Sequence, residues 1–241
     1  MKRQLPALVF VAAVAGVLAW WFLSPNPQQV AFRTRELATR GLAEHLVRVH
    51  AGKRVLIISN PFVQEAGTAR AIKEMEEAGV RGLREGFGTA VTIDGVVFPE
   101  LKSGARENPQ AALGDVETST PLSYLMTPDA LDRLVKLHPG CDLVVSLIGL
   151  PAELERCDNW SKAGAPRFAL LLPDLRIVGD AAAVVMAVKS GKLAAFALAR
   201  KGGPGDDVPH GGDPKAEFEK RFVLVTAENV EQTLAAMPEL F

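Results

Sequence analysis

The sequence predicts an α/β fold in which helices cover both faces of a mostly parallel sheet. The first observation is a set of short, wholly apolar runs that lack the alternation of a half-exposed strand, such as residues 55–58 and 142–149. The second is that amphipathic helical patterns separate these runs. The third is an uncharged stretch from Leu5 to Leu23. Together they predict a doubly wound sheet, Rossmann-like or flavodoxin-like, that follows an N-terminal transmembrane helix.

The N-terminal stretch is long enough, as a helix, to cross a hydrocarbon core of about 30 Å. Lys2 and Arg3 precede it, and the next basic residue is Arg33. By the positive-inside rule, the N-terminus is expected in the cytoplasm and the rest of the chain across the membrane. A cleaved signal peptide ending at Ala13-Val14-Ala15 is the alternative, although cleavage there would leave an apolar new terminus.

This interpretation divides the chain into three parts. Residues 1–23 are the expected cytoplasmic tip and transmembrane anchor, residues 24–29 a linker, and residues 30–241 an extracytoplasmic α/β domain. The expected location is the inner membrane, crossed once, with the domain in the periplasm.

In the first half of the domain, apolar periodicity predicts helices over residues 30–49 and 68–85, with a buried strand at 55–58 between them. A further strand is expected at residues 89–98, where Asp94-Gly95 is either a hairpin turn or a break within one strand. Residues 99–126 show no regular pattern. Long loops of this kind often cover functional sites, so this segment is a candidate cover.

In the second half, helix starts are expected at Thr127-Pro128, Ala152 and Asp180, and a last one at Thr226. The strands between them are expected at residues 142–149, 167–172, 192–200 and 221–226. The glycine-rich segment before the last strand looks too loose for a crossover helix. That strand is therefore expected at a sheet edge, where it could pair antiparallel to its neighbour.

Composition and motifs exclude several function classes. Lys and Arg total 27 against 28 Asp and Glu, and no basic run interleaved with aromatics occurs, so nucleic acid is not an expected partner. Cys141 and Cys157 match no metal or redox spacing and are either free thiols or, in an oxidising compartment, a disulfide. No catalytic, dinucleotide or phosphate-loop motif is present, so no cofactor and no metal are expected. One polar loop contains Asp206, Asp207, His210 and Asp213. These side chains could in principle coordinate a cation, but their spacing matches no known metal site.

Candidate binding residues follow from the rule that open parallel sheets bind ligands beyond the carboxyl ends of their strands. The candidates are residues that follow the expected strands: polar or aromatic side chains, a glycine and a proline. For each of them the alternative is an ordinary loop residue without a binding role. The predicted ligand-binding residues are Asn60, Phe62, Gln64, Glu65, Gly149, Pro151, Glu153, Asp174 and Arg200.

Three stretches resemble type I periplasmic substrate-binding proteins: "RVLIISNPFVQEAGTARAIKEMEEAG", "LDRLVKLHPGCDLVVSLIGLP" and "FVLVTAENVEQ". The resemblance implies a ligand-facing role for the loop Asn60 to Glu65 and the turn Gly149 to Glu153. Such proteins have two lobes and are secreted or lipid-anchored, whereas this chain has room for one lobe with elaborations. It also resembles membrane-anchored bacterial α/β proteins.

Three functions are therefore weighed. The first is a membrane-anchored domain that binds a small molecule or an envelope protein and catalyses nothing. The second is a scaffold subunit of an envelope complex. The third is an anchored hydrolase that uses a strand-end carboxylate, such as Glu65 or Asp174, with His210.

Overall fold

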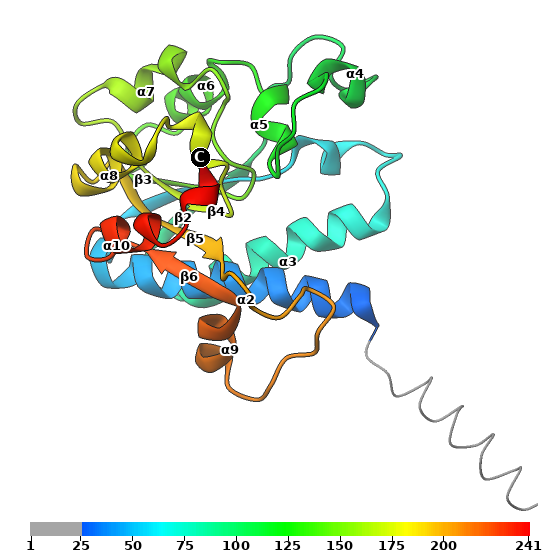
Figure 1. Ribbon diagram of the computed structural model, residues 1–241. Coiled ribbons are helices and arrows are strands. Elements are labelled where there is room, and N and C mark those ends of the chain that lie inside the picture. Colours follow the sequence, from blue (N-terminus) through cyan, green and yellow to red (C-terminus); the bar gives the residue numbers. More distant parts are fainter. Residues whose placement is uncertain (1–25) are drawn as a thin grey trace, which may run out of the picture.

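A six-stranded sheet with the order β2-β1-β3-β4-β5-β6 forms the middle layer of the computed structural model, which describes residues 26–241 (Figure 1). The first five strands are parallel, and β6 runs antiparallel to β5. This confirms the mostly parallel α/β sheet and the antiparallel edge strand. The strands are β1 (Arg54–Ile58), β2 (Thr92–Val97), β3 (Leu143–Ser146), β4 (Arg167–Leu171), β5 (Leu193–Ala199) and β6 (Phe222–Val225).

Helices cover both faces of the sheet. Figure 1 shows α2 and α3 on one side and α6, α7 and α8 on the other. The helices are α2 (Pro27–His50), α3 (Arg70–Phe87), α4 (Pro109–Leu113), α5 (Pro121–Leu125), α6 (Ala130–Leu137), α7 (Asp158–Ser161), α8 (Ala181–Lys189), α9 (Pro214–Arg221) and α10 (Val230–Ala235). Short 3₁₀ turns are η1 (Pro61–Gln64), η2 (Leu154–Arg156), η3 (Leu175–Ile177) and η4 (Pro238–Leu240).

The predicted transmembrane helix at residues 1–23 lies outside the described residues. From residue 26 onward, no helix is both long and apolar enough to cross a bilayer. Helix α2 begins at Pro27, three residues before the expected start. The Asn26 side chain caps it by accepting the Gln28 N–H at 2.9 Å, and Pro27 occupies the first helical position, where proline is favoured.

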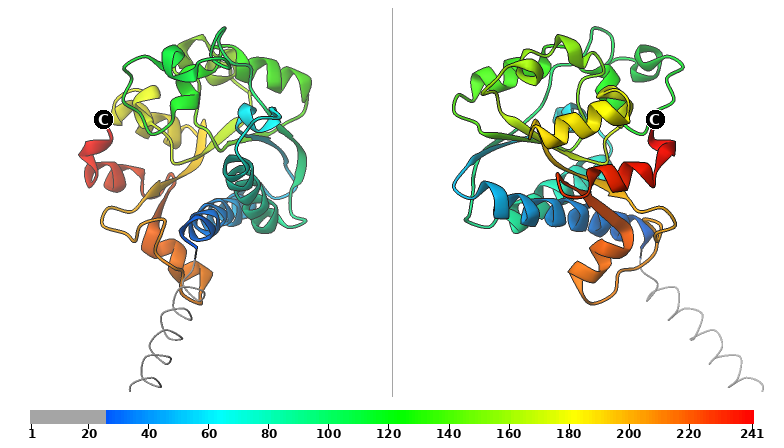
Figure 2. Two further views of the ribbon diagram at one scale, coloured as in Figure 1. Left: turned by 90° about the vertical axis from the view of Figure 1, so that its right-hand side faces the viewer. Right: turned by 60° about the vertical axis from the view of Figure 1, so that its left-hand side comes forward.

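Helices α2 and α3 pack side by side in both views of Figure 2 because α3 presents glycines to α2. A Cβ atom at Gly82 would lie 2.1 Å from the carbonyl oxygen of Glu36, and one at Gly86 would lie 2.6 Å from that of Arg40. These distances are far inside van der Waals contact. Only glycine lets the two helix backbones approach this closely.

Three local expectations change, and one open alternative is decided. Asp94-Gly95 is the break within one strand and not the hairpin turn: both residues lie within β2, whose register slips opposite Val55 and Leu56. Thr127-Pro128 does not start α6, because the Thr127 N–H bonds to Glu100 at the end of an antiparallel bridge, and the helix begins after Asp129.

The other two changes concern residues 152–160 and the loop before β6. The continuous helix expected from Ala152 is replaced by η2 and α7, so Pro151 is not in a first helical turn. Asp132 accepts the N–H groups of Asp158 and Asn159 at 2.8 and 2.7 Å and so fixes where α7 begins. The glycine-rich segment also contains a helix, α9, which the Asp213 side chain caps ahead of Pro214.

Candidate functional site

Strand order reverses beside β1, which has β2 on one side and β3 on the other. In open α/β sheets such a switch point leaves a crevice beyond the carboxyl ends of the two central strands. Here Ser59 follows β1 and Leu147 follows β3. These two residues therefore mark the place where the fold class binds ligands.

An ion pair occupies this switch point. Arg35 reaches in from α2, and its Nη2 donates to Glu76 Oε1 at 2.7 Å and to the Leu147 carbonyl at 3.3 Å. Glu76 Oε2 accepts from Ser59 Oγ at 2.7 Å and from the Asn60 N–H at 3.4 Å. The side chains of Arg35 and Glu76 are only 17% and 11% exposed. This network joins α2, α3 and β1 at the point where the fold class places ligands.

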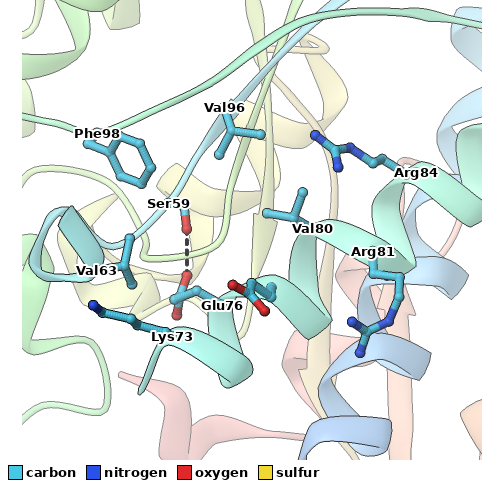
Figure 3. Close-up of a pocket in the computed structure, with 10 residues that line it drawn as sticks. Ser59, Val63, Lys73, Glu76, Val80, Arg81, Arg84, Val96 and Phe98 are labelled. Carbon is cyan, nitrogen blue, oxygen red and sulfur yellow. Dashed lines mark hydrogen bonds between the residues drawn. The ribbon is translucent and has the colours of Figure 1, made fainter. Parts of the chain in front are cut away.

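A pocket of about 470 Å³ opens beside the network, between α3 and β2. Figure 3 shows Lys73 toward one end of it and Arg84 toward the other, with Ser59 and Glu76 between them. Val80, Val96 and Phe98 are among its apolar walls. The lining residues are Ser59, Val63, Lys73, Glu76, Glu77, Val80, Arg81, Arg84, Val96 and Phe98. We call this cavity the α3–β2 pocket.

The charges lining the α3–β2 pocket are only partly neutralised within the protein. Arg81 binds Glu36 at 2.7 Å, and Glu76 binds Arg35. Among residues 26–241, no carboxylate lies within ion-pair distance of Lys73 or Arg84. No cation among these residues lies within ion-pair distance of Glu77. Two cations thus face one carboxylate, which leaves the pocket with an excess of positive charge over an apolar wall.

The segment 102–125, here called the strap, lies over the carboxyl ends of the strands. An antiparallel bridge between Leu101 and Met126 closes its base. Within the strap, Ser123 Oγ donates to the Ile148 carbonyl at 3.2 Å, and its own carbonyl accepts the Ala152 N–H at 2.9 Å. The strap therefore lies over the carboxyl end of β3 and is held there by these two hydrogen bonds.

Salt bridges hold the strap to two of the predicted binding residues. Glu153 binds Lys102 at 3.0 Å and also Arg156 at 2.7 Å, and these cations hold the pKa of Glu153 below its usual range. Glu65 binds Arg106 of the strap at 2.9 Å. Both carboxylates are thus engaged within the protein.

Asp174 fastens the strap to the β4 end. Its side chain is only 3% exposed and accepts two hydrogen bonds from the Arg176 guanidinium, at 2.8 and 2.7 Å, and one from Thr118 Oγ1 at 2.8 Å. These bonds, the Arg176 pair foremost, lower the pKa of Asp174. The adjacent hollow, of about 420 Å³, is a second, smaller cavity, between the strap and the C-terminal residues Glu239 and Leu240.

Asp174→Asn is expected to lower the free energy of unfolding at pH 7 by about 1–3 kcal/mol, because it weakens hydrogen bonds to a charged acceptor. The folded-state pKa of Asp174 is depressed, so its contribution is complete above the ordinary aspartate pKa of about 3.9 and is lost as the pH falls through the lower folded value. The difference between wild type and variant in urea unfolding should therefore shrink below pH 4. A difference that stays constant to pH 2.5 would contradict this role of the carboxylate.

The other predicted residues have local roles. Asn60 caps η1 by accepting the Phe62 N–H at 2.9 Å, and Phe62 packs against the core, while Gln64 ends η1 with its side chain exposed. Gly149 has a φ of +85°, and a Cβ there would lie 2.4 Å from Ser123 Oγ. Pro151 is buried beneath the strap region.

Arg200 lies apart from these residues. It donates to the carbonyls of Glu219 and Phe222 and lines a groove of about 520 Å³ between α2, α9 and β6. This groove is larger than the α3–β2 pocket but lies at the β6 edge, away from the switch point. The nine predicted residues are therefore spread over several surroundings, and none of them lines the α3–β2 pocket.

The sequence pattern contained a signal for this pocket. Six of its lining residues lie on α3 at helical spacing, which places them on one face: Lys73, Glu76, Glu77, Val80, Arg81 and Arg84. Strand-end reasoning considers only loops and so passes over a helix face. Val96 of β2 and Phe98, which follows that strand, complete the wall.

The residues considered for catalysis or metal binding have other contacts. His210 Nε2 lies 2.8 Å from Thr34 Oγ1, and His210 lines neither the α3–β2 pocket nor the hollow beside Asp174. Both cysteines are free and buried, and burial raises the pKa of Cys157 to about 12, so its thiol stays protonated. Within residues 26–241, no three His, Cys, Asp or Glu side chains gather in a geometry suited to a metal ion.

Comparisons with known proteins return solved structures of the type that the sequence resembles. No family model and no curated protein matches the chain. Solved structures do match, among them a solute-binding protein of Actinobacillus succinogenes with bound D-allose (12% identity, TM-score 0.43) and a sugar transport substrate-binding protein of Bordetella parapertussis (12%, 0.46). A carbohydrate transporter of Acidothermus cellulolyticus with myo-inositol matches similarly (12%, 0.44).

These alignments cover 82%, 82% and 86% of this chain but only 62%, 57% and 62% of the three proteins. The chain thus spans about three fifths of the length of these proteins.

Proposed function

We propose that the chain is a membrane-anchored, extracytoplasmic domain that binds a small organic anion in the α3–β2 pocket and catalyses no reaction. The observation that carries the proposal is the pair of cations, Lys73 and Arg84, that border an apolar wall without a carboxylate partner among residues 26–241. Lys73 is half-buried, whereas Arg84 is exposed. A half-buried cation without a partner is costly unless a ligand supplies the opposite charge, so this cost falls on Lys73.

The spacing of these cations defines the expected ligand. Eleven helical positions separate Lys73 from Arg84, a rise of about 16 Å along α3, with Val80 between them. A carboxylate at either end would meet a cation, and an apolar body would contact Val80, Val96 and Phe98. We therefore expect a carboxylic acid with an aliphatic or aromatic body.

The anchor is part of the proposal and is supported by the sequence. The stretch Leu5 to Leu23 carries no charge, and Lys2 and Arg3 precede it. A full chain anchored in this way remains in the membrane pellet after alkaline extraction, and a periplasm-dependent reporter fused after Phe241 is active. Release into the supernatant with a new N-terminus near Gly16 would instead support the cleaved signal peptide.

The absence of catalysis is also proposed. Glu65 is bound by Arg106, Asp174 by Arg176 and Thr118, and His210 contacts Thr34, so these side chains do not converge on one reacting position. General acid–base catalysis requires the groups to lie within hydrogen-bond reach of one substrate. The scaffold function stays an alternative, and the ligand-binding experiment distinguishes it from the proposed binding function.

Ligand binding is tested by thermal shift on the full chain in a non-ionic detergent. Octanoate and phenylacetate are the probes, with octanamide and phenylacetamide as uncharged controls of the same shape, and D-allose and myo-inositol as sugars. We expect the carboxylates to raise the melting temperature and the amides to have little effect, because a charge-assisted hydrogen bond contributes about 1.5–3 kcal/mol.

Two variants make the test specific to the pocket. Lys73→Gln and Arg84→Gln are each expected to weaken carboxylate binding by about 10-fold or more, since that corresponds to about 1.4 kcal/mol. Arg70→Gln, an exposed cation on the same helix that pairs with Glu74, is the matched control and should bind like wild type. Equal shifts in all three variants, or no shift with any compound, would refute the proposed site.

A further inference from the structure

We propose that the protein has a second binding site, for a phosphate group, at the amino ends of β4 and β5. A pocket of about 390 Å³ lies there, called the amino-end pocket. It is lined by Ser161, Lys162, Ala163, Gly164, Ala165, Arg167, Ser190, Gly191 and Lys192. Three of these side chains are cationic and none is acidic, in a protein whose net charge is only -1.

Three separate segments bring the cations together. Lys162 follows α7, Arg167 begins β4, and Lys192 precedes β5 after the turn that ends α8. Figure 1 shows α7 and α8 as neighbours at one end of the sheet. Gly191 has a φ of +75°, and a Cβ there would lie 3.7 Å from the guanidinium carbon of Arg167. The turn thus lies directly against the Arg167 guanidinium.

Lys192 is the half-buried member of the group. Its Nζ donates to the carbonyls of Asn159 at 3.0 Å and Lys162 at 3.3 Å, which are neutral acceptors. An ammonium has three N–H groups, so one remains for a ligand. Burial lowers the pKa of Lys192, which means that its positive charge is poorly solvated where it lies. A bound anion would relieve that cost.

Arg167 also lacks an acidic partner within residues 26–241, whereas Lys162 pairs with Asp158 at 2.6 Å. A guanidinium binds phosphate oxygens in pairs, and an ammonium adds a point charge. Arg167 and Lys192 together therefore suit a doubly charged phosphate monoester better than a single carboxylate. Free phosphate, a soluble phosphate ester and a phosphatidic acid headgroup share this chemistry.

His50 provides a reporter inside the protein. This buried residue ends α2, and its pKa is lowered by burial first and then by the positive charge of Arg167, with smaller effects from His45 and Lys53; Asp142 acts in the opposite direction. A phosphate bound to Arg167 would offset that positive charge. The pKa of His50 should then rise on binding.

The experiment is an NMR pH titration of the histidine ring protons in the full chain, in a maltoside detergent without phosphate groups. Inorganic phosphate, glycerol 3-phosphate and dihexanoyl phosphatidic acid are added in separate arms, and calorimetry measures each affinity. We expect at least one arm to bind and to raise the pKa of His50, and the arm that binds most tightly identifies the source of the phosphate group.

Arg167→Gln is the test variant because Arg167 is exposed and makes no ion pair on which folding depends. It should weaken binding at least 10-fold and should itself raise the pKa of His50 before any phosphate is added. Lys189→Gln, an exposed cation on α8 that pairs with Glu231, is the matched control and should bind like wild type. No binding in any arm, or equal loss in the two variants, would overturn the proposal.

Discussion

Glu76→Ala is expected to lower the free energy of unfolding by about 3 kcal/mol, because it leaves the Arg35 guanidinium buried without its partner. The same substitution removes the acceptor of Ser59 Oγ, a hydroxyl in a residue that is only 1% exposed. Loss of that hydrogen bond adds to the cost. Urea unfolding of the full chain, followed by circular dichroism, measures the change.

Two further variants distinguish the effect of breaking the Arg35–Glu76 ion pair from the effect of removing a carboxylate in general. Glu77→Ala removes the neighbouring exposed carboxylate, which is in no ion pair, and should change the free energy by less than about 0.5 kcal/mol. Arg35→Met combined with Glu76→Leu replaces both charges by apolar groups and should recover most of the loss. If Glu76→Ala and Glu77→Ala unfold at the same urea concentration, the ion pair does not hold the switch point together.

Gly82→Ala is expected to destabilise the protein by about 1–3 kcal/mol through overpacking. The new methyl group would lie 2.1 Å from the Glu36 carbonyl oxygen and 2.2 Å from Thr39 Oγ1, so α2 and α3 must move apart. In an isolated helix the same change is favourable by about 1 kcal/mol, which makes the predicted sign opposite to that of helix propensity. The measurement is again the urea midpoint.

Gly67→Ala is the matched control for this prediction. A Cβ at Gly67 meets no atom within 4 Å, and the backbone there is not in the left-handed region. We expect a neutral or slightly stabilising effect, because alanine lowers the entropy of the unfolded chain. A Gly82→Ala variant as stable as Gly67→Ala would show that the helices are not held at the distance described.

The fold was predictable from the sequence wherever burial alone decides. Central strands such as β3 are buried on both faces and must be apolar, so periodicity located them. The helices with strong caps were equally clear, as at Asp180, whose side chain accepts the Ala183 N–H. The expectations that failed depend on contacts between distant residues, such as Asp132 with Asn159, which no local pattern contains.

The same limit applies to the candidate site. The switch-point rule led to the edge of the sheet beside which the proposed pocket lies and to Asn60, next to Ser59. It did not identify Arg35, because that side chain arrives from α2 and is brought there only by the packing of α2 on α3. Lys73 and Arg84 read as ordinary solvated cations until the structure places β2 opposite them.

The most direct test of the account is a ¹³C-methyl NMR titration of the full chain with octanoate. Val63, Val80 and Val96 supply methyl groups on the wall of the α3–β2 pocket, and Leu37 and Leu224 report on the groove at the β6 edge. We predict saturable shifts of the three valines whose midpoint lies at an octanoate concentration about 10-fold or more higher in Lys73→Gln, with the two leucines unchanged. Shifts confined to the leucines, or valine shifts with the same midpoint in Lys73→Gln as in the wild type, would contradict the proposed site.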